Sequence, residues 1–338
     1  MRTALAALLL LAACKDDAVD SGVPDNGLVR ALDFDVVAAD FDLANERVVV
    51  ASASPSPALQ LVDPGGDAVD TLALPAAPLA LDVRRAGDRA LVLHEGAVSI
   101  VDLDGLAVLD TIDLGAVTGG TVLLSGGEYG YALSWGDPIR AHGFSLEIGT
   151  PSVAPVEPFD GQLTLAMHPD EDRVYGTGTG ATPQDLHRWS FDGARLAYDG
   201  DSPYEGEYQF GGAVWVTDDG ARVVTYRGEV FTLTGGEGAD IAYLQALSVT
   251  GQALDVASRD AGSRLAVRLS DALTLFDLDT LEPQGPLTLP TFTHDGEAYT
   301  AAPVPGGWWF SADGAALYVL VGSGDAASGP FGLVTLDL

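Results

Sequence analysis

Short runs in which apolar and polar residues alternate occupy most of the chain, and the clearest set lies between Pro78 and Leu114. Glycine-bearing turns separate these runs, and alternation with a period of two between such turns predicts an antiparallel meander of four strands. The predicted strands are Leu79–Val83, Ala90–Leu93, Ala97–Asp102 and Ala107–Leu114. One such meander buries too little surface to be stable alone, so it must pack against units of the same shape.

The same unit recurs along the chain, and its most recognisable part is the turn between its first two strands. Seven such turns precede an apolar strand, at Asn45, Gly87, Gly127, Glu171, Gly220, Gly262 and Gly314. Gly and Asn recur there because a tight turn needs a positive φ. The turns are 40 to 52 residues apart, and a period in the forties with four strands per unit is typical of propeller blades. The sequence therefore predicts an all-β, seven-bladed propeller with four-stranded antiparallel blades.

The two ends of the repeat array complement each other. The last repeat stops at its third strand, Leu333–Leu338, and no fourth strand follows. At the other end, Leu28–Asp35 precedes the first repeat and matches the fourth strand of the second one. Pairing these segments would remove two open sheet edges. We therefore expect the N-terminal strand Leu28–Asp35 to complete the C-terminal blade, so that residues 28–338 form one domain.

Composition and charge narrow the choice of partners. Hydrophobic residues make up 47% of the 338 residues, enough for a substantial core. The chain has 49 acidic and 16 basic residues, and its formal charge of −33 repels phosphate backbones and anionic lipid headgroups. We therefore expect no nucleic-acid partner and interpret the acidity mainly as a source of solubility. Cys14 is the one cysteine in the sequence, which excludes an intramolecular disulfide.

The first 27 residues differ from the repeats. Residues 1–13 hold a short segment with Arg2 and an apolar run that is too short for a permanent membrane span. The run ends in Leu11-Ala12-Ala13-Cys14, which resembles the bacterial lipobox. That resemblance implies cleavage before Cys14, lipidation of Cys14, and a location in the bacterial cell envelope, periplasmic or surface-exposed, with the membrane contacted through the lipid anchor. Residues 14–27 would then be the lipidated cysteine and a polar, flexible tether.

The third strands carry a second resemblance. Apolar runs ending in Asp and followed by Gly or Thr recur, as in VSIVDLDG from Val98 and LTLFDLDT from Leu273. These runs resemble the blades of YVTN-type and WD-repeat-like bacterial propellers, although the tetrapeptide YVTN itself is absent. Seven-bladed propellers of this general kind include binding and scaffolding modules. They also include lactonase-like and quinone-dependent dehydrogenase-like enzymes, which hold a metal or cofactor in the central channel.

Motifs for catalysis are scarce. The five histidines form no HExxH or other paired spacing, and the sequence contains no G-x-S-x-G, P-loop or S-x-x-K motif. His168 is followed by Asp170, Glu171 and Asp172, which invites a metal interpretation, but the segment coincides with a turn found in every repeat. We therefore expect a structural role for His168. Gly176–Gly180 is rich in glycine but has no lysine, and we interpret it as a loop.

Two regions remain as candidate sites. In a propeller, the loops that join the second strand to the third and one blade to the next lie on one face, which we call the long-loop face. Aromatic and acidic residues gather in these longer loops, and we predict a ligand-binding face there, made of Trp135, Asp137, Tyr204, Glu205, Tyr208, His294 and Asp295. Trp308 and Trp309 are expected to pack between blades.

The second candidate site is the channel, which the first strand of each blade lines. These strands carry few polar residues, and three carboxylates, Asp40, Asp82 and Asp255, are candidates to hold a cation. We predict no cofactor, with a divalent cation such as calcium as the alternative. The functional hypothesis is an envelope-anchored binding or scaffolding module that recognises a protein, peptide or glycan. The alternatives are a propeller enzyme and a structural subunit of an envelope complex.

Overall fold

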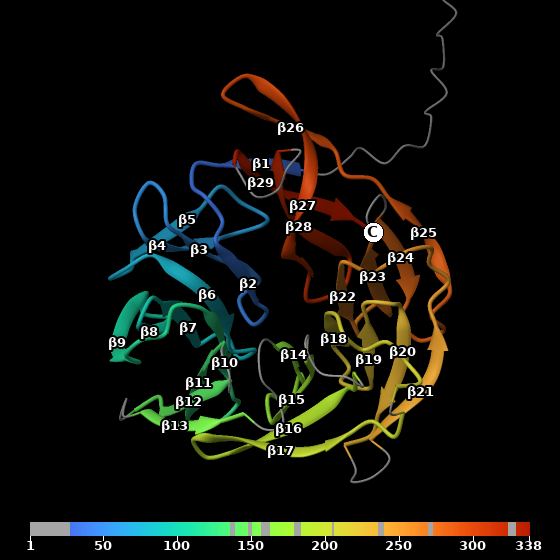
Figure 1. Cartoon of the computed structure of the whole chain (residues 1–338). Coiled ribbons are helices and arrows are strands. Elements are labelled where there is room, and N and C mark those ends of the chain that lie inside the picture. The colour runs from blue at the N-terminus through green and yellow to red at the C-terminus, as the bar shows by residue number, and fades with distance from the viewer. Residues whose placement is uncertain are drawn as a thin grey trace, which may run out of the picture.

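Seven antiparallel sheets surround a central channel in the computed structural model and form one ring (Figure 1). The structure describes residues 28–135, 139–147, 151–156, 163–178, 184–204, 206–235, 240–269, 273–323 and 329–338. The predicted signal peptide, Cys14, the tether, Asp137 and Glu205 lie outside these ranges. The prediction of an all-β propeller with seven blades is confirmed.

Six of the sheets have four strands in chain order, and the first strand lies nearest the channel (Figure 1). Blade 1 contains β2 (Ala38–Asp42), β3 (Arg47–Ser52), β4 (Ala58–Val62) and β5 (Val69–Ala73). Blade 2 contains β6 (Pro78–Val83), β7 (Arg89–His94), β8 (Ala97–Asp102) and β9 (Ala107–Asp113). Blade 3 contains β10 (Gly120–Leu124), β11 (Tyr129–Ser134), β12 (Arg140–Ser145) and β13 (Pro151–Pro155).

The next three blades repeat this plan. Blade 4 contains β14 (Leu163–Met167), β15 (Arg173–Gly178), β16 (His187–Asp192) and β17 (Arg195–Asp201). Blade 5 contains β18 (Val214–Val216), β19 (Arg222–Thr225), β20 (Glu229–Leu233) and β21 (Ile241–Ala246). Blade 6 contains β22 (Asp255–Arg259), β23 (Arg264–Arg268), β24 (Leu273–Asp277) and β25 (Pro283–Leu287).

Blade 7 joins the two ends of the chain. It contains β26 (Thr291–His294), β27 (Glu297–Phe310), β28 (Ala316–Ser323), β29 (Phe331–Asp337) and, from the other end of the chain, β1 (Leu28–Leu32), in the spatial order β1-β29-β28-β27-β26. The antiparallel register of β1 on β29 places Leu28 opposite Thr335 and Leu32 opposite Phe331. The predicted closure of the ring is therefore confirmed, with a strand that ends at Leu32 rather than Asp35.

The hairpin β26–β27 is an addition that the sequence analysis placed in a loop. Its turn contains Asp295 and Gly296, both with positive φ, which is the conformation that a two-residue hairpin turn requires. Phe292 is buried and its ring lies 5.5 Å from that of Tyr299 across the hairpin. The hairpin projects outwards from the ring beside β1 (Figure 1).

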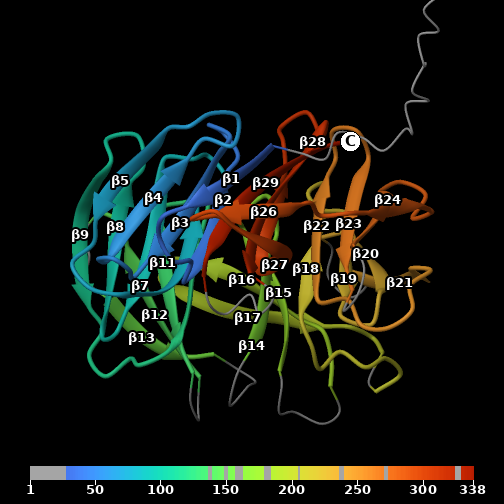
Figure 2. The same ribbon diagram turned by 90° about the horizontal axis from the view of Figure 1, so that it is seen from above.

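Burial follows the position of each strand in its blade. The middle strands β3 and β7 are buried along almost their whole length, whereas the outer strand β5 is mostly exposed. Blades stack face to face around the ring, as the view turned by 90° shows (Figure 2). A strand covered on both faces needs a continuous apolar run rather than alternation. In the described ranges no helix has the length and apolar character needed to cross a membrane.

The turns between first and second strands behave largely as predicted. Positive φ angles occur at Gly87, Gly220, Gly262 and Gly314, and also at Glu171, which is not glycine, but not at Gly127, where the prediction was wrong. In blade 1 the positive φ lies at Glu46 rather than at Asn45. These turns surround one end of the channel, which we call the inner-turn end. Several of them are tied to the next blade, for example by the backbone N–H of Gly126, which donates to the Glu171 carbonyl at 2.9 Å.

Candidate ligand site in the central channel

A cavity of about 620 Å³ occupies the channel. Residues of six inner strands line it, and Leu124 of β10 adds the seventh. Ligand pockets in proteins span about 300–1,000 Å³ and combine apolar walls with a few polar groups. The cavity therefore has the size of a small-molecule site.

The wall of the cavity is chemically uneven. Following the ring, β22, β27, β2 and β6 are consecutive neighbours, and they carry Asp255, Trp308, Asp40 and Asp82 respectively. Across the channel the strands β10, β14 and β18 line the cavity mainly with apolar side chains: Leu124, Leu165, Ala166, Met167, Val214, Trp215 and Val216. Among the inner strands, one side of the cavity is thus acidic and aromatic, and the other is apolar. Arg85, Glu171, Asp218 and Arg259 add charged groups to the lining.

Asp40 and Asp82 join adjacent blades. Asp40 Oδ2 accepts a hydrogen bond from the backbone N–H of Val83 at 2.7 Å, and Asp82 accepts one from Leu124 of the third blade. Burial raises the pKa of Asp40 to about 6, against the opposing effect of its backbone hydrogen bonds. Burial, and next the charge of Asp40, raise the pKa of Asp82 well above its usual value. Both carboxyl groups therefore lie in a place where negative charge is costly.

Asp255 occupies the corresponding place between blades 6 and 7. One carboxylate oxygen accepts from the backbone N–H of Gly306, and the other from Val256 at 3.0 Å. Gly306 has a φ of +68° and lies in an irregularity of β27 between Pro303 and Trp308. Such bulges redirect a strand and are common beside functional sites. Burial raises the pKa of Asp255, and its hydrogen bonds oppose that effect.

Trp308 stands beside Asp255. Its side chain is only 3% exposed and, as expected, packs between blades 6 and 7, and it also borders the cavity. The indole N–H is near enough to lower the pKa of Asp255, but its nitrogen meets no acceptor in normal hydrogen-bond geometry. The neighbouring Trp309 stacks on Phe41 of blade 1 with 5.9 Å between ring centres, which agrees with the expected packing between blades.

Charged side chains cross the channel at its inner-turn end. Arg85 of blade 2 forms an ion pair with Asp218 of blade 5, and its backbone N–H donates to the Glu171 carboxylate of blade 4. Arg259 of blade 6 also pairs with Asp218, at 3.3 Å. The sequence analysis missed this network. The signal that was available is the position of each residue at the end of an inner strand or in the turn that follows it.

The residues predicted for the long-loop face do not form one cluster. Tyr204 and Tyr208 pack edge to face at 5.1 Å, and Tyr208 stacks on Tyr243 of β21 at 5.0 Å. Both also contact Phe231, so they cover the core of blade 5. Trp135 is half-buried and packs against the core shared by blades 3 and 4.

His294 and Asp295 lie away from the channel, at the tip of the β26–β27 hairpin. His294 Nδ1 is 3.6 Å from the Asp295 carboxylate, and its Nε2 is 3.8 Å from that of Asp33. Asp33 and Asp295 are almost fully exposed. The structure therefore places these two predicted residues on the outer rim of the ring, apart from Tyr204 and Tyr208.

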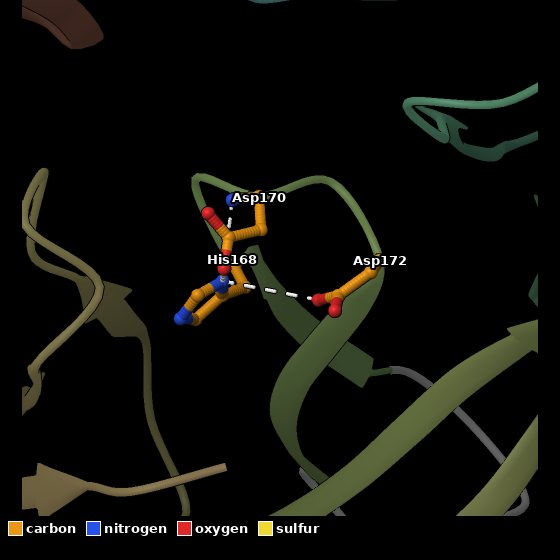
Figure 3. Close-up of side chains that lie close together, drawn as sticks. All are labelled: His168, Asp170 and Asp172. Atoms are coloured by element: carbon orange, nitrogen blue, oxygen red, sulfur yellow. Dashed lines mark hydrogen bonds and ion pairs between the residues drawn. The ribbon is translucent and has the colours of Figure 1, made fainter.

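A close-set group of potential metal ligands surrounds His168 (Figure 3). Among the described residues, His168, Asp170 and Asp172 are the group of at least three whose ligand atoms lie within 4.8 Å of one another. The imidazole is nevertheless engaged on both sides. Its Nδ1 accepts from the backbone N–H of Asp170 at 3.2 Å, and its Nε2 donates to the Gly220 carbonyl at 3.1 Å. This arrangement ties blade 4 to blade 5, as expected for a structural histidine.

Another histidine resembles part of a catalytic pair but is inaccessible. His94 Nε2 lies 2.9 Å from Ser99 Oγ, which in turn is 3.2 Å from Thr111 Oγ1. His94 is 1% exposed and Ser99 is fully buried. Burial lowers the pKa of His94. The pair therefore stabilises blade 2 and offers no nucleophile to a substrate.

A second cavity, of about 280 Å³, lies between the outer parts of blades 4 and 5. At its wall Asp240 accepts hydrogen bonds from Tyr175 at 2.6 Å, from Arg188 at 2.7 Å and from the backbone N–H of Thr234 at 2.7 Å. Burial alone would raise the pKa of Asp240, but the hydrogen bonds from Tyr175 and Arg188 lower it. The protein therefore offsets the cost of burying the charge of Asp240 with its own hydrogen-bond donors.

Comparison with known proteins identifies the fold. No protein-family model matches the chain, and no curated protein sequence matches it. A chain of hydrazine synthase from Kuenenia stuttgartiensis matches with a TM-score of 0.60 and 14% identity, covering 91% of this chain and 97% of that one. The β-propeller domain of Cps50 (Swd1) from Myceliophteria thermophila matches with a TM-score of 0.64 and 11% identity, covering 91% and 98%.

At 14% and 11% identity, these two likenesses show the propeller fold alone, and the seven blades are seen in the sheet topology. A total of 1371 solved chains match, so the fold is widespread. One fold of this kind hosts many unrelated functions, and the activity of one member does not transfer to another. The function must therefore be argued from the site.

Proposed function

We propose that the protein is an envelope-anchored binding module that takes a small ligand into its central channel. The observation that carries the proposal is the cavity of about 620 Å³, whose wall combines apolar and aromatic side chains with buried carboxylates. Groups with displaced pKa values gather at functional sites because function needs charge in places where folding alone would avoid it. Asp40 and Asp82 meet that description.

Binding accounts for the channel better than catalysis does. A lactonase-like or quinone-dependent enzyme would need a metal-ligating or cofactor-holding set in the channel. Asp40, Asp82 and Asp255 each bond to the backbone of the next blade. They do not belong to the close-set ligand group found among the described residues.

The anchoring part of the proposal rests on Leu11–Cys14. A lipobox cysteine carries several acyl chains, and more than one chain is needed for stable attachment to a bilayer. Expression of the full chain with an alkyne-labelled fatty acid in a lipoprotein-processing bacterium tests it. We expect Cys14 to become labelled and the protein to sediment with membranes, whereas Cys14→Ser should lose both properties. An unlabelled wild-type chain would contradict the anchor.

The channel part of the proposal can be tested without knowing the ligand. The purified chain is dialysed against the small-molecule fraction of a bacterial envelope extract, and retained compounds are identified by mass spectrometry. We expect a compound that is retained by the wild type and lost in Ala257→Phe, because Ala257 lines the cavity. Ala315→Phe, at an exposed turn, is the matched control. Equal retention by the filled variant would exclude the channel.

A second candidate function is recognition of a protein, peptide or glycan by the loops. The hairpin β26–β27 favours it, because this addition to the four-strand plan projects from the ring (Figure 1). Thr291, Thr293 and Glu297 are exposed on it. A photo-crosslinking amino acid at Asp295 should then capture one defined envelope partner in cells. The same group at the exposed Asp110 of the outer strand β9 is the control, and identical products from both positions would contradict this candidate.

A further inference from the structure

We infer that the ligand of the channel is an organic cation, in which an ammonium group is attached to an apolar body. This inference rests on the proposed function, because it names the chemical class of the ligand in the same cavity. It depends on three properties of the wall: carboxylates without a cationic partner, an aromatic side chain between them, and an apolar surface opposite.

The carboxylates of the channel fall into two groups. At the inner-turn end, Asp218 pairs with both Arg85 and Arg259. In contrast, Asp40, Asp82 and Asp255 form no ion pair with any side chain in the described part of the chain. Asp40 and Asp82 hold only hydrogen bonds, whereas the more distant charge of Arg268 also acts on Asp255. Buried charges in proteins are normally paired, because an unpaired one costs free energy. A cation that enters the cavity would supply the missing partner.

The aromatic wall points to an organic cation. Trp308 lies on β27, between the strand that carries Asp255 and the strand that carries Asp40. It is buried in the core shared by blades 6 and 7 and borders the cavity, and its indole nitrogen meets no acceptor in hydrogen-bond geometry. Tryptophan faces attract ammonium groups through the ring quadrupole, most strongly when water is excluded. A carboxylate on either side of a tryptophan is a suitable environment for an ammonium group.

The opposite wall accounts for the apolar body. Leu165 and Met167 of β14 and Val214 and Val216 of β18 line the cavity across from the acidic side. A bare metal ion would leave this surface without a partner, and the channel carboxylates are not set within 4.8 Å of one another as a group of ligands. An anion is disfavoured by the carboxylates themselves. A cation with an attached hydrocarbon group therefore satisfies both walls at once.

The probe for this inference is phenethylammonium, with 2-phenylethanol as the neutral analogue and phenylacetate as the anion. Binding to the full chain at pH 7.5 is followed by calorimetry and by tryptophan fluorescence, since Trp215 and Trp308 line the cavity. We expect saturable binding of the ammonium compound, at least tenfold tighter than binding of the alcohol, and no binding of the anion. Calcium chloride is titrated in parallel.

Substitutions test whether the channel carboxylates bind phenethylammonium. Asp40→Asn with Asp82→Asn should weaken phenethylammonium binding at least tenfold. The control Asp70→Asn with Asp110→Asn removes the same charge from exposed outer strands and should leave binding unchanged. If the first variant does not fold, Asp255→Asn takes its place, and the selectivity of the wild type already decides the question.

The outcomes separate the two proposals. Equal affinity for the amine and the alcohol would overturn the inference while leaving a ligand site in the channel. Saturable binding of calcium without the amine would assign a metal site instead. If no probe binds but the dialysed extract yields a channel ligand, the proposed function stands and the cation is wrong. If the extract yields none either, both proposals fail.

Discussion

Two buried acidic regions of this propeller are built in opposite ways. Asp240, between the outer parts of blades 4 and 5, accepts hydrogen bonds from Tyr175, Arg188 and backbone amides. Its pKa is lowered in spite of its burial. Asp40 and Asp82 accept bonds from backbone amides alone, and their pKa values are raised.

The difference separates a carboxylate whose counter-charge the protein supplies from carboxylates that have none among the described residues, to which our proposal assigns a bound cation. A buried charge contributes to folding when the protein supplies its counter-charge, and it weakens folding when it does not. The region around Asp240 needs nothing more than the chain provides. The channel carries a cost in stability that a bound cation would remove.

The largest effect is expected at Asp240. Replacement by Ala leaves Arg188 buried with one fewer carboxylate, so Asp240→Ala should lower the free energy of unfolding by about 3 kcal/mol or more. The half-exposed Asp199, which also pairs with Arg188, is the control, and Asp199→Ala should cost less than about 1 kcal/mol. Chemical denaturation gives both values. Equal losses of unfolding free energy would show that Asp240 is not the main counter-charge of Arg188.

In the channel, removing a carboxylate charge is expected to raise the free energy of unfolding rather than lower it. A pKa of about 6 for Asp40 means that the folded state binds a proton more tightly than the unfolded state. The resulting stability is therefore present below about pH 4 and is lost as the pH rises through 6. Asp40→Asn removes the charge, which is worth about 3 kcal/mol at pH 8, but its amide group can no longer accept both N–H bonds, from Phe41 and Val83, which costs about 1 kcal/mol. The variant should therefore be more stable than the wild type by about 2 kcal/mol at pH 8.

At pH 3.5 the charge effect is absent, and the Asp40→Asn variant should be less stable than the wild type by about 1 kcal/mol, because its amide nitrogen cannot accept one of the two backbone N–H bonds. Thermal melts of both proteins across this range give the comparison, in the absence of ligand. If the variant is less stable than the wild type at pH 8, the Asp40 carboxylate stabilises the fold, as the Asp240 carboxylate does, and the prediction is wrong.

A third carboxylate extends the comparison to the inner turns. Asp42 is fully buried and accepts hydrogen bonds from Arg47 and Asn45. A Cβ at Gly87, where φ is +74°, would lie 2.1 Å from Asp42 Oδ1. Gly87→Ala should therefore cost about 2 kcal/mol, from backbone strain and from displacing this carboxylate.

Gly115 provides the matched control for that substitution. Its φ is +73°, and a Cβ there would meet nothing within 4 Å. Gly115→Ala should cost about 1 kcal/mol, which is the backbone strain alone. The two free energies of unfolding are measured in denaturant. If the two substitutions lower the free energy of unfolding equally, the close packing of blade 1 against blade 2 at Asp42 does not contribute to stability.

The smallest effect is expected at the exposed carboxylates near His168. Asp170→Asn with Asp172→Asn should change the free energy of unfolding by less than about 0.5 kcal/mol, because both side chains are exposed. Zinc should not raise the melting temperature of the wild type, because both imidazole nitrogens already hold hydrogen bonds. A zinc-dependent increase that the double variant loses would make this cluster a metal site.

The pattern of alternating residues predicted the ring, the number of blades and its closure, because each blade repeats a local signal. Leu28–Asp35 could be matched to Leu333–Leu338 since one lacked a partner strand and the other lacked a fourth strand. The hairpin β26–β27 was missed because its region was assigned to a loop, although Asp295-Gly296 is a hairpin signal.

Contacts between blades that are far apart in the sequence could not be predicted from the sequence. Arg85 meets Glu171 and Asp218 only because three different blades place their turns around one end of the channel. Tyr204 and Tyr208 were correctly recognised as loop aromatics, but their packing on Phe231 depends on how the loop folds back. The channel carboxylates were identified because the inner strands carry few polar residues, but their hydrogen bonds to the backbone of the next blade were not predicted.

The ionisation of Asp40 tests the central claim most directly. Carbon NMR of the aspartate-labelled full chain follows its carboxyl carbon, which is assigned by its absence in Asp40→Asn. The account predicts a midpoint near pH 6 in the free protein. It also predicts a clear downward shift when phenethylammonium is bound, because a nearby cation favours the ionised form. A midpoint near 4 in the free protein, or no change with the amine, would contradict the claim that the channel is built for a cation.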